Sequence, residues 1–300
     1  MGLVGMVAFA HPGSAQIAVL GSPDIHVDQS GTVVAPGDVS EDIEILTPAV
    51  IDLGPLPDGA EVNSYSPLSA TEQYFTLAHT LALPGGVTAR PRDVVLWDGV
   101  SYTIALDGGI FGFPDGAAID ALAIDPFSFS SWLSFDTTVD LSGNIFRDAD
   151  VFDELFNKVF DATVAGVPAG MDVDAVGMIP ATNDVLLSFD IGGTLGGITF
   201  ADEDVLRYDP DGDTWMMVID TSATQPSWAA ADLDALTPVP EPAGTAMLAT
   251  GLAALGMAAR RRRHVQTRCS STPVNLNMTT QPERSLPSVP EASQAVPQRT

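Results

Sequence analysis

An internal repeat constrains the fold of this chain more than any other feature of its sequence. A short motif, of which Leu187-Ser-Phe-Asp190 is one version, recurs four times, and an aspartate follows its third residue by 15 positions. The third residues are spaced by 51, 57 and 54 positions, and they pair with their aspartates as follows: Val27 with Asp42, Ala78 with Asp93, Phe135 with Asp150, and Phe189 with Asp204. A nearly constant period of this size predicts one supersecondary unit per copy.

A second motif follows each copy and supports the same period. Its four versions are Val62-Asn-Ser-Tyr65, Ile119-Asp-Ala-Leu122, Val173-Asp-Ala-Val176 and Leu233-Asp-Ala-Leu236. The two motifs together divide a body of residues 16–236 into units 16–61, 62–118, 119–172 and 173–236.

The segments within a unit have the character of short β-strands. Residues 185–189, 204–208 and 214–219 are rich in β-branched or aromatic side chains, and Gly, Asp and Pro bound them. Three or four strands in a unit of about 50–60 residues indicates a β-propeller blade, whose usual length is about 40–50 residues. The sequence therefore predicts an all-β repeat protein, a four-bladed β-propeller-like ring closed by pairing of its first and last strands. The alternative is an irregular sandwich of two antiparallel sheets.

One segment of the body has a helical pattern. Over residues 148–161, Val151, Leu155 and Val159 recur at the spacing that places side chains on one helix face. We expect a helix there.

Charge is distributed unevenly along the chain. The net charge is −27, but residues 1–259 carry five basic side chains against 37 acidic ones, whereas residues 260–300 carry seven arginines against two glutamates. So acidic a body repels phosphate backbones, which excludes nucleic acid as a partner. The contrast predicts that the body and the tail face different surroundings. A single cysteine excludes a disulfide framework and a cysteine-rich metal site.

The first residues have part of the pattern of a secretory signal peptide. An apolar run over residues 1–10 is followed by a proline, a glycine and small residues, although the usual basic start of a signal peptide is missing. We expect a truncated signal peptide over residues 1–15, cut between Ala15 and Gln16. The alternative is a buried first strand.

Three elements follow the repeat body in a fixed order. A proline-rich linker over residues 237–242 contains the motif Val239, Pro240, Glu241 and Pro242, and an uncharged apolar segment fills residues 243–259. This segment approaches the length needed to cross a bilayer, so it predicts a short transmembrane helix. Four arginines follow as a stop-transfer cluster that favours the cytoplasmic side, namely Arg260, Arg261, Arg262 and Arg263.

This order resembles the PEP-CTERM sorting signal of bacterial envelope proteins. The resemblance implies that an exosortase, a membrane cysteine protease-transpeptidase, recognises the chain and processes it at or near Pro-Glu-Pro. It also implies an exopolysaccharide-producing host. The chain departs from the family because residues 264–300, rich in Ser, Pro, Gln and Thr, follow the arginines. They predict a disordered tail. The alternative for residues 243–259 is a plain single-pass anchor or a buried helix.

The aspartates of both motifs recur with the fold, which favours a structural role. Aspartates that accept hydrogen bonds from loop amides fix turns, and this is the role expected for the repeated aspartates, including Asp120, Asp174 and Asp234. The competing interpretation pairs two of these carboxylates for acid–base cleavage of a glycosidic bond.

Asp209, Asp211 and Asp213 form the D-x-D-x-D start of a calcium-binding loop. The sixth position of that loop is Thr214 rather than glycine, and a strand pattern follows, so a plain hairpin turn is the preferred interpretation. Ca²⁺ at these three residues is the alternative, and the sequence predicts no other cofactor.

Histidines and tryptophans add no clear site. Only His26 and His79 fall in the body, in different units, which does not favour a zinc site. The tryptophans could stack on sugar rings if exposed, but core packing is the preferred role for those in or beside predicted strands. The four tryptophans of the chain are Trp97, Trp132, Trp215 and Trp228, and the first three are the ones in or beside predicted strands.

These features favour an exported, non-enzymatic protein of the cell envelope or extracellular matrix. The sequence contains no nucleophile elbow, P-loop or Rossmann glycine pattern. The expected partners are an exosortase, the inner membrane through the C-terminal helix, and exopolysaccharide. The body is expected outside the cell and the arginine cluster in the cytoplasm. The alternatives are a carbohydrate-binding module, with or without Ca²⁺, and a glycan-cleaving enzyme.

Overall fold

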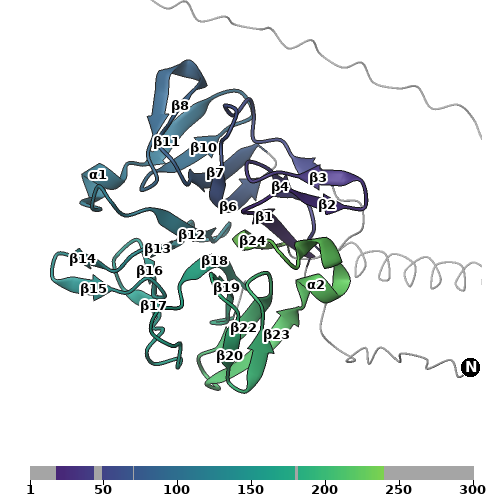
Figure 1. The fold of residues 1–300 in the computed structure, drawn as a ribbon. Helices are drawn as coiled ribbons and strands as arrows, with labels where there is room; N and C mark the ends of the chain where they lie inside the picture. Colours follow the sequence, from purple (N-terminus) through teal and green to yellow (C-terminus); the bar gives the residue numbers. More distant parts are fainter. Residues whose placement is uncertain (1–17, 44–48, 70, 180–181, 240–300) are drawn as a thin grey trace, which may run out of the picture. The chain divides into compact units, whose positions relative to one another are not determined.

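The computed structural model describes residues 18–239, apart from residues 44–48, 70 and 180–181. Four four-stranded antiparallel sheets form most of this part of the chain and are arranged in a ring, each with one strand on the inside (Figure 1). We call these sheets blades and number them in chain order. The predicted four-bladed, all-β propeller-like ring is confirmed.

Each blade runs from an inner strand to an outer one. Blade 1 consists of β24 (Leu233–Val239), β1 (Ala18–Pro23), β4 (Val39–Ser40) and β5 (Val50–Ile51). Blade 2 consists of β6 (Val62–Ser69), β7 (Glu72–Leu77), β10 (Val94–Trp97) and β11 (Tyr102–Leu106). Blade 3 consists of β12 (Ile119–Ile124), β13 (Ser131–Phe135), β16 (Val151–Asp153) and β17 (Lys158–Phe160). Blade 4 consists of β18 (Val173–Met178), β19 (Val185–Phe189), β22 (Val205–Asp209) and β23 (Thr214–Ile219).

A small extra hairpin separates the second and third strands of every blade. The four hairpins are β2 (Val27–Gln29) with β3 (Thr32–Val34), β8 (Leu81–Leu83) with β9 (Val87–Ala89), β14 (Val139–Leu141) with β15 (Asn144–Phe146), and β20 (Gly193–Leu195) with β21 (Ile198–Phe200). Helical turns are short: α1 (Gly108–Phe111), α2 (Thr221–Thr224) and the 3-10 turns η1 (Pro84–Gly86) and η2 (Pro226–Trp228). A unit therefore has six strands, more than the three or four expected.

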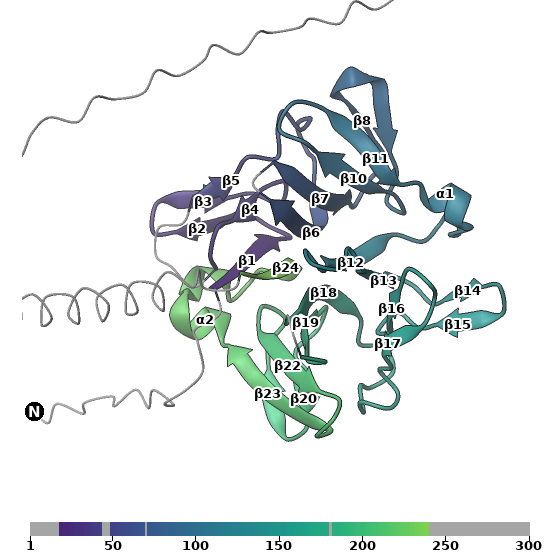
Figure 2. The same cartoon turned by 180° about the vertical axis from the view of Figure 1, so that it is seen from behind.

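The ring closes by pairing the two ends of the described chain. Strand β24 pairs antiparallel with β1, so the last strand becomes the inner strand of the first blade. The inner strands β6, β12, β18 and β24 contact their neighbours all the way around (Figure 2). The propeller axis is the line that these four strands surround.

Apolar packing between blades holds the ring together. Each of the four buried clusters joins two neighbouring blades rather than filling one blade. Between blades 2 and 3 the filling is aromatic, with Phe113 edge-on to Phe135 at 4.9 Å and Phe135 stacked on Phe152 at 5.2 Å between ring centroids. Because apolar burial is the main favourable term in folding, removal of one blade would expose two of these clusters.

The predicted helix over residues 148–161 is wrong, because this segment forms the hairpin of β16 and β17. The Asp153 carboxylate accepts hydrogen bonds from the backbone N–H groups of Leu155 at 2.9 Å and Asn157 at 2.8 Å. Phe156 has a φ of 62°, outside the right-handed helical region. Val151 is buried while Leu155 is 73% exposed, so the helical spacing of apolar residues does not correspond to a shared face.

None of the helices in the described part of the chain is long and apolar enough to cross a membrane. The predicted signal peptide over residues 1–15, the transmembrane segment 243–259 and the tail 264–300 lie outside the described residues.

Candidate functional site on the propeller axis

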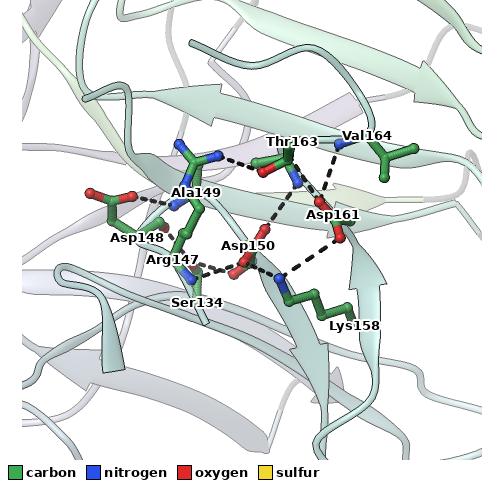
Figure 3. A network of polar contacts seen from close by, with 10 residues as sticks. Ser134, Arg147, Asp148, Ala149, Asp150, Lys158, Asp161, Thr163 and Val164 are labelled. Carbon is green, nitrogen blue, oxygen red and sulfur yellow. Dashed lines mark hydrogen bonds and ion pairs between the residues drawn. The ribbon is translucent and has the colours of Figure 1, made fainter. Parts of the chain in front are cut away.

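The aspartates of the first repeat motif hold the outer hairpins of the blades. Asp150 is fully buried, and its Oδ2 accepts a hydrogen bond from the backbone N–H of Arg147 at 2.9 Å while its Oδ1 accepts one from Ala162 at 3.0 Å (Figure 3). Lys158 Nζ lies 2.6 Å from the same Oδ2. Asp93 and Asp204 make the equivalent pairs of backbone bonds in blades 2 and 4. These three aspartates have the turn-fixing role expected of them.

In blade 1 the equivalent aspartate is Asp38, not Asp42. Asp38 Oδ2 accepts from the backbone N–H of Ala35 at 3.0 Å, as Asp150 does from Arg147. The hydroxyl of Ser22 donates to the carbonyl of Asp38, as Ser134 does to that of Asp150. The second strand of this blade is β1, in which Gly21 and Pro23 occupy positions that are apolar in the other copies of the motif. Residues 25–28, which the sequence assigns to the motif, lie before and in β2 of the extra hairpin.

The polar residue of the second repeat motif occupies a β-bulge at the start of each inner strand. In β12, Ile119 pairs with Phe135 and Ala121 with Ser134, so Asp120 has no partner residue. The register skips one residue in the same way in the other three inner strands, at Asn63, Asp174 and Asp234. A bulge redirects the side chain of the extra residue. The Asn63 side chain accordingly reaches the neighbouring blade, where its Nδ2 donates to the carbonyl of Ile119 at 3.1 Å.

These bulges bring carboxylates of different blades together. One carboxylate oxygen each of Asp120 in blade 3 and of Asp172 and Asp174 at the start of blade 4 lie within 4.8 Å of one another. Asp174 also shares a hydrogen bond with the side chain of Asp232, which precedes the inner strand of blade 1. We call Asp120, Asp172, Asp174, Asp232 and Asp234 the axial carboxylates.

Burial raises the pKa of every axial carboxylate. Desolvation is the largest cause throughout, and neighbouring carboxylates add to it. The pKa rises to about 8 for Asp172 and Asp234 and to about 7 for Asp232. The pKa values of Asp120 and Asp174 also rise well above the ordinary range. The neighbouring carboxylates that contribute are Asp24, Glu61, Asp136, Asp148, Asp190 and Asp202.

Within the described residues, the axial carboxylates have no cationic partner. The ion pairs of Arg92, Lys158 and Arg207 in residues 18–239 all go to other carboxylates. Asp120 is 5% exposed, and neither of its oxygens has a hydrogen-bond partner of good geometry there. The backbone N–H groups of Asp120 and Ala121 lower the pKa of this carboxyl and so offset its burial only in part. The predicted turn-fixing role is therefore wrong for Asp120.

A pocket opens at the other end of the inner strands. It has a volume of about 720 Å³, and the residues after the middle of β6, β12, β18 and β24 contribute to its wall. We call this cavity the mouth pocket. Asp120 and Ile124 lie near opposite ends of β12, so at about 3.3 Å per residue the axial carboxylates are roughly 13 Å from the mouth pocket. The aromatic and amide side chains that line the pocket are Tyr65, Gln73, Trp97 and Trp132.

The lining of the mouth pocket is mostly apolar, with polar groups at fixed positions. Gln73 Nε2 donates to the carbonyl of Asp52 at 3.3 Å, and the Tyr65 hydroxyl donates to Gln73 Oε1 at 3.4 Å. Asp125 also lines the pocket, and its carboxylate accepts from the Phe127 N–H at 2.8 Å. This combination of a large apolar wall and a few oriented polar groups is typical of small-molecule sites.

The remaining tryptophans and the histidines lie elsewhere. Trp228, for which the sequence predicts no core role, is fully buried between blades 4 and 1. Trp215 packs against Tyr208 at 4.8 Å between ring centroids. His26 is exposed, and His79 lies 3.4 Å from Glu61.

Asp209 is the last residue of β22, and Asp211 and Asp213 lie in the turn between β22 and β23. Asp209 Oδ1 accepts from the backbone N–H groups of Asp211 at 2.9 Å and Gly212 at 3.1 Å, as a hairpin turn requires. Asp213 Oδ1 accepts from the Tyr208 hydroxyl at 3.0 Å. In the described ranges, the one group of three carboxylates close enough to share a metal ion is Asp120, Asp172 and Asp174.

The predicted sorting residues lie mostly beyond this part of the chain. Val239 ends β24 and pairs with Ala18, whereas Pro240, Glu241, Pro242 and the cluster Arg260, Arg261, Arg262 and Arg263 lie outside the described residues.

Comparison with known proteins gives no family. No family model matches the chain, and no curated protein matches it. Among solved structures, it is similar to the extracellular domain of a one-component system from B. thetaiotaomicron, with a TM-score of 0.31 and 8% identity over 68% of this chain and 28% of that one. It is also similar to a protein of unknown function from Bacteroides caccae, with a TM-score of 0.31 and 11% identity over 76% of this chain and 100% of that one. Similarity at this level carries no conclusion about function.

Proposed function

We propose that this protein is an exported, non-enzymatic component of the cell envelope or extracellular matrix, held briefly in the inner membrane and sorted by an exosortase. The observation that carries the proposal is the order of three elements after the propeller. They are the Pro-Glu-Pro motif at 240–242, the uncharged segment 243–259 and the arginine cluster 260–263.

The end of the propeller supports this proposal. Strand β24 completes the ring and ends at Val239, directly before Pro240. Processing at or near Pro-Glu-Pro would therefore release every strand of the propeller in one piece. The whole ring, with its large excess of acidic side chains, would then remain outside the cell.

The position of the axial carboxylates supports a non-enzymatic role. Asp120 and Asp174 come from different blades and lie close together, as a glycan-cleaving pair would, but neither lines the mouth pocket. Of the acids in that pocket, Asp125 accepts hydrogen bonds within its own turn, and Asp52 Oδ1 accepts from the Gly54 N–H at 2.9 Å. These contacts hold both side chains in loop-fixing positions.

The sorting proposal is tested by a Glu241→Ala substitution in a host that contains an exosortase. We expect the variant to stay in the membrane fraction at its full length, while the original chain is shortened and leaves the membrane. Asp211→Ala, an exposed substitution within the body, is the matched control and should be processed normally. Identical size and location of the Glu241→Ala variant and the original chain would reject exosortase sorting.

A second candidate function, carbohydrate binding, is favoured by the aromatic wall of the mouth pocket. Trp132 is partly exposed there, and the wall of this cavity of about 720 Å³ also includes the buried side chains of Tyr65, Gln73 and Trp97. Aromatic faces beside oriented amide and hydroxyl groups suit a sugar ring, which has apolar faces and polar edges.

The carbohydrate proposal is tested by affinity electrophoresis in gels that contain the host's exopolysaccharide. We expect Trp132→Ala to remove the retardation of the protein. Met216→Ala, which changes an exposed apolar side chain on β23, should leave it unchanged. Equal migration of the protein with and without polysaccharide, or equal retardation of both variants, would reject binding at this pocket.

A further inference from the structure

We propose that Asp120, Asp172 and Asp174 bind one Ca²⁺ ion on the propeller axis. The proposal does not depend on the mode of sorting or on carbohydrate binding. It locates a cation site at a different place from the hairpin of Asp209, Asp211 and Asp213.

The geometry of the three carboxylates fits a single ion. Ca²⁺ binds oxygen ligands at about 2.3–2.6 Å, so two oxygens bound to the same ion lie at most about 4.6–5.2 Å apart. One oxygen each of Asp120, Asp172 and Asp174 lie within 4.8 Å of one another, which satisfies this limit. Mg²⁺ binds at about 2.0–2.1 Å and demands near-ideal octahedral geometry, whereas Ca²⁺ accepts flexible arrangements of oxygen ligands.

The unpartnered side chain of Asp120 is an independent observation in favour of a ligand. Asp120 is only 5% exposed, and both oxygens of its carboxyl group are buried. Neither oxygen has a hydrogen-bond partner of good geometry in residues 18–239. Buried polar groups are nearly always satisfied, and an exception often marks an ion or a water molecule. A bulge gives Asp120 its position, and a bulge of the same register places Asp174 opposite it.

The chemistry of the donors selects the ion. All three ligands are carboxylates, and no histidine or cysteine belongs to the group. Hard oxygen donors favour Ca²⁺ over zinc or copper, which prefer nitrogen and sulfur ligands. One buried and two half-buried carboxylates without a protein cation need either protons or a metal ion to compensate their charge.

An ion at this site would connect blades. Asp120 belongs to the inner strand of blade 3, and Asp172 and Asp174 belong to the start of blade 4. Asp174 further contacts Asp232, beside the inner strand that closes the ring. Bound Ca²⁺ would therefore stabilise the junction between blades 3 and 4.

The test uses the full chain, purified in mild detergent and stripped of metal with EDTA that is then removed. Isothermal titration with CaCl₂ should show one site per chain. At a Ca²⁺ concentration about 100 times the dissociation constant, the melting temperature should rise by roughly 5–10 °C. Asp120→Asn should weaken Ca²⁺ binding at least tenfold. Asp211→Asn, in the hairpin between β22 and β23, should bind like the original chain.

Melting of Asp120→Asn and of the original chain, each with and without Ca²⁺, distinguishes loss of the cation site from loss of the fold. Without metal, Asp120→Asn removes a buried uncompensated carboxyl group, so this variant should melt at or above the temperature of the original chain. With saturating Ca²⁺ the order should reverse. Failure of millimolar Ca²⁺ to bind or to raise the melting temperature of the original chain would overturn the proposal. Loss of binding in Asp211→Asn but not in Asp120→Asn would also overturn it, and would place the ion in the hairpin.

Discussion

Asp120 and Asp174 occupy the same position of neighbouring inner strands, and an oxygen of each carboxyl group lies within 4.8 Å of the other. They are 54 positions apart in the chain, and each is the extra residue of a β-bulge. Fourfold repetition thus places one acidic side chain per blade beside the axis, except in blade 2, where Asn63 takes that position. Repetition of one acidic position in successive blades is therefore enough to gather acidic side chains beside the axis.

The first prediction concerns the pH dependence of stability at Asp234. Burial raises the pKa of this carboxyl group to about 8, with further contributions from Asp232, Asp24 and Glu61. The unfolded chain ionises this group near pH 4 while the folded chain keeps its proton until near pH 8, so stability decreases as the pH rises through that window. Asp234→Asn removes this loss. In metal-free buffer we expect the variant to equal the original chain at pH 4 and to exceed it by at least about 2 kcal/mol at pH 8.

Urea denaturation at a series of pH values measures this effect. Asp211→Asn, in an exposed turn, serves as the control and should follow the original chain throughout. A stability difference between Asp234→Asn and the original chain that stays constant from pH 4 to 8 would contradict the proton-bearing state of the half-buried Asp234.

The second prediction concerns the turn-fixing aspartate of blade 3. Asp150→Ala leaves the backbone N–H groups of Arg147 and Ala162 without their acceptor and removes the ion pair with Lys158. Because these groups are buried or half-buried, we expect a loss of about 3 kcal/mol of unfolding free energy. Asp140→Ala removes a single exposed bond to the Gly143 N–H and should cost about 0.5–1 kcal/mol. Equal losses of unfolding free energy for the two variants in chemical denaturation would contradict the larger contribution of the hydrogen bonds and ion pair of Asp150.

The third prediction concerns the close packing of the inner strands. A Cβ atom on Gly177 of β18 would collide with the side chain of Leu236 on β24 and lie 2.7 Å from Pro238 Cδ. Gly177→Ala should therefore destabilise the ring by about 1–3 kcal/mol.

Gly116→Ala provides the matched control for this substitution, because a Cβ there meets no atom within 4 Å. It should be neutral or slightly stabilising, since alanine restricts the unfolded chain. If the two alanine variants melt at the same temperature, β18 and β24 are not packed as described.

The repeat was predictable from the sequence because the turn-fixing aspartates are tied to hydrogen bonds that each blade needs. Asp93, Asp150 and Asp204 all satisfy the same pair of backbone N–H groups. The copy in blade 1 was misaligned because Gly21 and Pro23 replace the apolar residues of its second strand. The register of a strand is hard to assign once its alternation is lost.

Three of the axial carboxylates were identified from the sequence by their repetition, whereas Asp172 and Asp232 were not, and the close approach of these groups was not predicted. Asp120, Asp174 and Asp234 recur with the period, which alone favours a turn-fixing role. A one-residue bulge changes the face of the sheet on which the following side chains lie. The alternation of apolar and polar residues in the sequence does not show where such a bulge occurs. A polar residue at one fixed position before a small residue in every inner strand was the available signal, as in Asn63-Ser and Asp120-Ala.

Labelling of cells without an exosortase by a membrane-impermeant maleimide tests the proposed topology directly. In this topology the propeller is outside the cell and the arginine cluster is in the cytoplasm. The single cysteine of the chain, Cys269, follows the arginine cluster. A second variant carries Cys269→Ser and Val100→Cys, since Val100 is 85% exposed in the turn between β10 and β11. We expect the reagent to label the cysteine at position 100 in spheroplasts and to label Cys269 only after the membrane is permeabilised. Labelling of Cys269 in sealed spheroplasts while position 100 is protected would contradict this topology.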